Sequence, residues 1–80
     1  MNDQEILQRI EQLVKEEHDL LQRAEEADLN EADHARMKAL EVSLDQCWDL
    51  LRQRRARRAA GLNPDEAQAR DPAIVEHFQQ

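Results

Sequence analysis

Residues that interrupt helices are nearly absent from this chain of 80 residues, which has one glycine and two prolines. Aromatic residues are also scarce, with one phenylalanine and no tyrosine. The apolar residues are mainly leucine, isoleucine, valine and alanine, and 36% of the chain is charged. Few helix breakers combined with many strong helix formers favour long helices over a sheet or a disordered chain. The sequence therefore predicts an all-α protein.

Side chains that serve as nucleophiles or metal ligands are also scarce. Ser43 is the only hydroxyl-bearing residue and Cys47 the only cysteine, so no internal disulfide can form. His18, His34 and His77 show no His-x-x-His spacing, and no Cys-x-x-Cys pair exists. Neither an orienting group nor an oxyanion hole for a Cys–His pair can be recognised. We therefore expect a protein that is not an enzyme, with no catalytic residue, no metal site and no cofactor.

The charge balance and the hydropathy pattern narrow the class of partner. The formal net charge of −7 opposes nonspecific binding to nucleic acid or to an anionic membrane. No apolar run approaches the roughly 20 residues that a membrane span needs. The first residues are acidic and lack the basic start of a signal peptide, and a single cysteine suits a reducing compartment. We expect a cytoplasmic protein that binds no membrane and for which nucleic acid is an unlikely partner.

A first helix is predicted over residues 3–27. Apolar residues recur there in pairs seven apart, as Ile6-Leu7, Leu13-Val14 and Leu20-Leu21. This stripe is wider than the seam of a two-stranded coiled coil, and it suits packing against more than one neighbouring helix.

A second helix is predicted over residues 31–60, with Asn30 as its N-cap and Gly61 after its end. Val42 and Leu50 lie off the main stripe, so they are either incidental or part of a second buried face. Trp48 widens the stripe, and we expect it to anchor the core or, in a dimer, the interface. The main stripe steps by three and four residues through Met37, Leu40, Leu44, Cys47 and Leu51.

The short turn near Leu29 makes the two helices antiparallel, so residues 1–60 form a helical hairpin. Residues 61–80 form a tail with two helix-start signals, Asn63-Pro64 and Asp71-Pro72. Two helices cannot enclose both apolar stripes. We therefore expect a homodimer that completes a four-helix bundle with coiled-coil packing, and the alternative is that the tail folds back over the stripe.

An arginine run at the end of the second helix is the most conspicuous charged feature. Antiparallel packing brings this run beside the acidic start of the first helix, which favours a structural role for the arginines. Two alternatives are that the arginines bind phosphates of nucleic acid or an acidic protein. Counting from Leu51, we expect Arg52 and Arg55 to lie nearest the seam and the others to point outward. The candidate interaction residues are Trp48, Leu50, Arg52, Arg54, Arg55, Arg57 and Arg58.

Three segments of the sequence form a distinctive pattern. The most specific of them is the central run Leu44-Asp45-Gln46-Cys47-Trp48-Asp49-Leu50-Leu51-Arg52-Gln53-Arg54-Arg55-Ala56. The start adds Glu5-Ile6-Leu7, Ile10 and Glu16-Glu17-His18, and the tail adds Pro64-Asp65-Glu66-Ala67 and Asp71-Pro72-Ala73-Ile74-Val75-Glu76. Together these segments resemble a family of short bacterial proteins, a domain of unknown function found mainly in actinobacteria. The resemblance implies a small stand-alone helical protein and supplies no activity.

The leading functional prediction is therefore a non-enzymatic interaction or structural protein. It would form homo-oligomers and present its charged helix faces to an unidentified protein partner. The alternative is a nucleic-acid-binding protein that uses the arginine run of residues 52–58.

Overall fold

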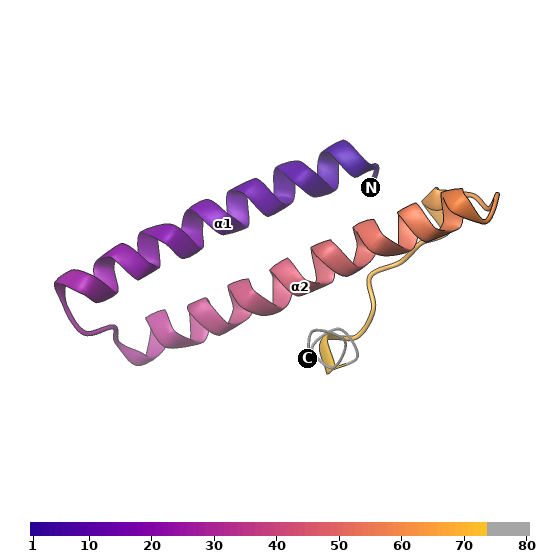
Figure 1. Cartoon of the computed structure of the whole chain (residues 1–80). Coiled ribbons are helices and arrows are strands. Elements are labelled where there is room, and N and C mark those ends of the chain that lie inside the picture. Colours follow the sequence, from indigo (N-terminus) through magenta and orange to yellow (C-terminus); the bar gives the residue numbers. More distant parts are fainter. Residues whose placement is uncertain (74–80) are drawn as a thin grey trace.

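The computed structural model describes residues 1–73 and contains two long helices packed against each other. Helix α1 spans Asp3–Glu26, helix α2 spans Glu31–Ala59, and a single 3₁₀ turn, η1, spans Pro64–Glu66. Each long helix ends one residue before its predicted end. The helices run in opposite directions and form a hairpin (Figure 1), and no strand occurs in the described part of the chain.

Each helix end is closed by a local capping interaction. The Asn2 side chain accepts a hydrogen bond from the backbone N–H of Glu5, whose carboxylate accepts one from the N–H of Asn2, which is a capping box. Asn30 caps α2 by accepting from the N–H of Asp33, as predicted. Gly61 follows α2 with φ at +75°, and the N–H of Leu62 reaches back to the Arg57 carbonyl in a Schellman motif.

The core between the helices is narrow and consists of two adjoining clusters. Near the open end of the hairpin, Ile6 and Ile10 of α1 pack with Leu51 of α2. Towards the turn, Leu13 and Leu20 pack with Leu40, which is completely buried. The half-buried Leu44 and Cys47 of α2 contact both clusters. These contacts confirm the predicted facing stripes.

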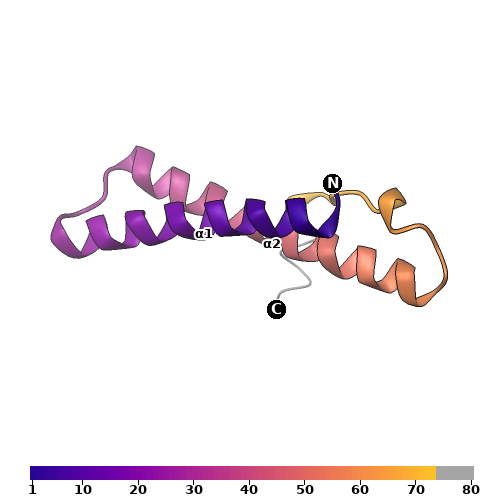
Figure 2. The ribbon, with the colours of Figure 1, turned by 90° about the horizontal axis from the view of Figure 1, so that it is seen from above.

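The molecule is elongated because two helices cannot form a round core. The Cα radius of gyration is 14.8 Å, whereas a compact chain of this length would have roughly 12 Å. Seen from above, α1 and α2 cross along their length (Figure 2). A single layer of side chains therefore holds the hairpin together.

After η1 the chain turns back along α2 on the side that faces away from α1 (Figure 1). Two polar contacts fix this segment, because Gln46 donates a hydrogen bond to the Arg70 carbonyl at 3.1 Å and Gln53 donates one to the Gln68 carbonyl at 2.7 Å. Helix α2 is thus buried on two sides, and the half-buried Leu50 packs against the core cluster near the open end and also lines a cavity together with Ala69 of the tail. Ile74, Val75 and Phe78, the large apolar residues in the last part of the tail, lie outside the described residues.

Candidate functional site

The arginine run is mostly committed to ion pairs within the molecule. Arg54 is 5% exposed, and its Nε donates a hydrogen bond to the Asp3 carboxylate at 2.5 Å. Its Nη1 donates to the Pro64 carbonyl at 3.1 Å and to the Asp65 carboxylate at 3.0 Å. One guanidinium group therefore ties together the start of α1, the end of α2 and η1.

Two further arginines complete the junction at this end of the hairpin. Arg58 donates to both carboxylate oxygens of Asp3, at 3.2 and 2.5 Å. Arg57 donates to the Asn63 carbonyl at 2.7 Å and to the Glu66 carboxylate at 2.6 Å. The guanidinium groups of Arg58 and Arg54 lower the pKa of Asp3 to about 2, so Asp3 is ionised at neutral pH.

The predicted orientation of the arginines is wrong. Arg54 is buried instead of pointing outward, whereas Arg55 and Arg52 are exposed. Arg54 and Arg55 flank the seam on opposite sides, because they follow Leu51 by three and four residues. Asp3 and Asp65 both pair with Arg54, and no acidic side chain of the described residues pairs with Arg55. Helical phase alone could not reveal this difference.

Asp49 is a buried carboxylate that sequence reasoning did not identify. It is 1% exposed, and it accepts hydrogen bonds from both Nε and Nη2 of Arg70, with the Nε contact at 2.9 Å. Gln53 donates a further hydrogen bond to it at 2.9 Å. Hydrogen bonding from Arg70 is the main cause that keeps the pKa of Asp49 below its ordinary value, in spite of burial. Its position between Trp48 and Leu50, in the most apolar part of α2, is the sequence signal that could have revealed it.

Trp48 does not anchor the core of the chain, because it is 43% exposed. Three apolar residues of α1 share this exposure, namely Leu7 at 46%, Val14 at 46% and Leu21 at 52%. They are seven residues apart and therefore form a straight stripe along the helix, roughly 80° around it from the middle of its buried stripe. They are the second members of the predicted apolar pairs, of which only the first members are buried.

Trp48 lies on the same face of the hairpin as this stripe. It is displaced by roughly 70° from the buried stripe of α2, in the same rotational sense. In two antiparallel helices, side chains that are displaced from the contact line in the same rotational sense lie on the same face of the helix pair. The ion pair between Arg36 and Glu16 agrees, because both residues are displaced the other way and meet at 3.0 Å on the opposite face. We call Leu7, Val14, Leu21 and Trp48 the uncovered face.

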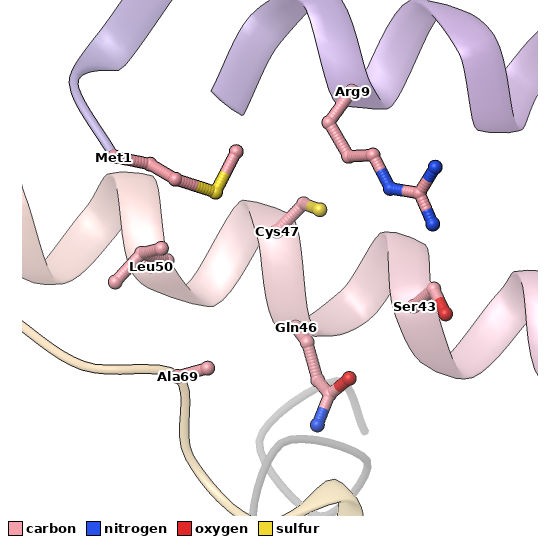
Figure 3. A pocket seen from close by; sticks show the side chains of 7 residues that line it. All are labelled: Met1, Arg9, Ser43, Gln46, Cys47, Leu50 and Ala69. Atoms are coloured by element: carbon pink, nitrogen blue, oxygen red, sulfur yellow. The ribbon is translucent and has the colours of Figure 1, made fainter. Parts of the chain in front are cut away.

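A small cavity lies on the side of the hairpin away from the uncovered face. Its volume is about 240 Å³, and the Cys47 thiol reaches its rim near Arg9 (Figure 3). Burial raises the pKa of Cys47 while the nearby Arg9 opposes the shift, so the group is a neutral thiol and a weak nucleophile. The cavity is lined by Met1, Arg9, Ser43, Gln46, Cys47, Leu50 and Ala69.

No group typical of a metal site and no helix able to span a membrane occurs within residues 1–73. His, Cys, Asp and Glu side chains nowhere gather in a group of three that could hold a metal ion. Neither long helix is apolar enough over a sufficient length to cross a bilayer.

Comparison with known proteins places this hairpin in a family. A family model described as "Protein of unknown function (DUF2630)" matches residues 2–80. The chain belongs to the DUF2630 family. An uncharacterized protein of Mycobacterium bovis and one of Mycobacterium tuberculosis are each 42% identical to it over 77 residues, covering 95% of this chain and 88% of theirs.

The resemblance recognised in the sequence is thereby confirmed, since these relatives of the DUF2630 chain are actinobacterial. No solved structure matches it. The comparisons assign no activity, so a function has to be argued from the geometry of the hairpin.

Proposed function

We propose that the protein is a non-enzymatic helical interaction protein that pairs with a second copy of itself through the uncovered face. The observation that carries the proposal is the straight stripe of Leu7, Val14 and Leu21, each about half exposed, beside Trp48. A repeat of seven is the spacing by which helices pack against neighbouring helices. Burying these side chains against a second copy would remove them from water.

The described part of the tail, residues 61–73, does not compete for the uncovered face. Its hydrogen bonds to α2 involve Gln46, Asp49, Gln53, Arg54 and Arg57, and none of these residues belongs to the uncovered face. The alternative considered from the sequence, in which the tail covers the exposed stripe, is therefore not supported by the contacts of residues 61–73. A second copy is the cover that the sequence predicted.

The lack of a catalytic arrangement within residues 1–73 supports a binding role. Cys47 is a neutral thiol in a narrow cavity, and the carboxylates of Asp49 and Asp3 are neutralised by arginines. The paired molecules would act in the cytoplasm, where a single cysteine stays reduced, and would present their charged outer faces to a protein partner.

Nucleic acid fits the same arginines less well. Arg52, Arg54, Arg57 and Arg58 form ion pairs with acidic side chains of this chain, which leaves Arg55 as the member of the run with no ion pair among the described residues. The net charge of −7 also repels a polyanion. In fluorescence anisotropy we expect no binding to a generic RNA or DNA duplex at physiological salt. Binding that weakens steeply with added salt would favour the nucleic-acid alternative.

Sedimentation equilibrium at micromolar concentration tests self-association. The wild-type protein should have twice its chain mass of 9.4 kDa. Val14→Lys should shift it to the monomer, because a lysine in the middle of an apolar interface would be desolvated without a partner. Gln8→Lys, which makes the same change of charge on an exposed position away from the stripe, should remain dimeric. A wild-type monomer would refute the proposal.

A further inference from the structure

We infer that the two copies pack with their turns at the same end, so that α1 of each lies against α2 of the other. This inference rests on the proposed function and adds the arrangement of the pair. Two hairpins that meet through the same face are related by a two-fold axis within the interface. That axis runs either along the helices or across them.

The two axes bring different helices into contact. An axis along the helices places each α1 over the partner's α2, in antiparallel orientation, and puts both turns at one end. An axis across the helices places α1 over the partner's α1 and puts the turns at opposite ends. Apolar packing alone does not choose between them, because the uncovered face meets itself in both.

The net charges of the two helices favour the axis along the helices. Helix α1 has eight acidic and three basic residues, which gives a net charge of −5. Helix α2 has five acidic and seven basic residues, which gives +2. Contact between two α1 helices would bring −5 against −5, whereas contact between α1 and the partner's α2 brings opposite charges together.

Individual side chains at the edge of the uncovered face show the same preference. A two-fold axis along the helices leaves the level of each residue unchanged, so residues at equal height in one hairpin also meet across the pair. Arg55 then comes level with Asp3, which remains 37% exposed despite its two arginine partners. No ion pair of Arg55 is found within the described chain, and its charge is free for this contact.

A similar match occurs nearer the turn. With the turn at Leu29, residues whose numbers add up to roughly 58 lie at the same height. Glu41 is therefore level with the region of His18, and His34 is level with the region of Glu25. All four side chains are exposed. Each pair combines a carboxylate with an imidazole, and these two groups do not repel each other.

Spin-label distances distinguish the two arrangements directly. In a Cys47→Ala background, Asp28→Cys places one nitroxide label at the exposed turn, and Ala59→Cys in a separate sample places one at the far end of α2. Turns at the same end predict distances of roughly 10–25 Å between the two labels of a dimer in both samples, as for neighbouring helices. Turns at opposite ends predict roughly 35 Å or more in both, since α1 alone is about that long.

The outcomes separate this inference from the proposed function. Short distances in both samples support the arrangement. Long distances in a preparation whose mass is dimeric overturn the arrangement and leave self-association intact. A monomeric mass without any dipolar signal between molecules overturns both. The mass of the unlabelled Cys47→Ala background, measured in parallel, shows whether the removal of the thiol itself changes association.

A charge variant provides a second test. Arg55→Gln should weaken the dimer roughly 2- to 20-fold, because two equivalent exposed ion pairs are lost per dimer. Arg9→Gln makes the same charge change on the cavity side and should leave the dissociation constant unchanged. Added salt should reduce the difference between the dimer dissociation constants of the two variants. An equal effect of both substitutions would contradict the arrangement.

Discussion

Replacement of Asp49 by asparagine should release the tail from α2. The carboxylate is 1% exposed and accepts two hydrogen bonds from Arg70 and one from Gln53. Asparagine has nearly the same shape, but it carries no charge and places an NH₂ group where one of the two oxygens accepts. The substitution therefore tests the charge and the acceptors of Asp49 with little change in packing.

The expected loss is about 1.5–3 kcal/mol of unfolding free energy, the usual contribution of a hydrogen bond to a charged group. It stays below the range for fully buried ion pairs, because the Arg70 side chain is 40% exposed and regains water when it is released. For a chain of this size the loss corresponds to a fall in Tm of roughly 6–20 °C.

Urea denaturation followed by circular dichroism measures this loss, and limited trypsin digestion shows where it acts. Cleavage after Arg70 should become faster in Asp49→Asn before the helices themselves are attacked. Asp45→Asn, an acidic position one turn away with no ion pair among the described residues, is the matched control. If both variants lose less than about 0.5 kcal/mol and are cleaved at the wild-type rate, Asp49 does not hold the tail.

Three further outcomes follow from the structure. Leu13→Ala should cost about 2–5 kcal/mol in urea denaturation because the residue is 2% exposed, whereas Leu62→Ala, at an exposed position, should cost less than about 1 kcal/mol. Arg54→Ala should lower Tm more than Arg55→Ala, since it leaves two carboxylates without their buried partner, and the reverse order in thermal melts would refute the junction. Stability should fall as the pH drops from about 4 towards 2: Asp3 has a folded-state pKa of about 2 against an ordinary value of 3.8, so its contribution is complete above 3.8 and is lost as it becomes protonated. An Asp3→Asn variant should show a flatter acid transition, and an unchanged transition would exclude Asp3 as a cause.

The helices, the turn and the caps could be predicted from sequence because each depends on residues close together in the chain. Asn30 and Gly61 cap α2 in the predicted places, and Leu13 and Leu40 lie on the predicted stripes. Periodicity and capping chemistry are local signals, and a short turn then fixes the antiparallel direction.

The junction and the tail contacts could not be predicted in the same way. Arg54 is buried because Asp3 and Asp65, far from it in sequence, arrive at the same side of α2. No periodicity records such a meeting, and exposed and buried arginines look alike in a sequence. Trp48 was misplaced for a related reason, since its position at the edge of the stripe fits an interface between chains as well as a core.

The Arg54 junction has a consequence for the ends of the chain. Because one guanidinium binds Asp3 and Asp65, shortening the protein from either side would leave the same buried cation short of a counter-charge. The two ends are thereby coupled through a residue in the interior of α2, and neither can be varied independently of the other. Extra length is better accommodated at Asp28, in the exposed turn opposite the junction, where the ion pair that spans the turn, between Asp33 and the exposed Arg23, involves no buried cation. We therefore expect related hairpins to differ in length more readily by insertions in the turn than by losses of residues at the termini.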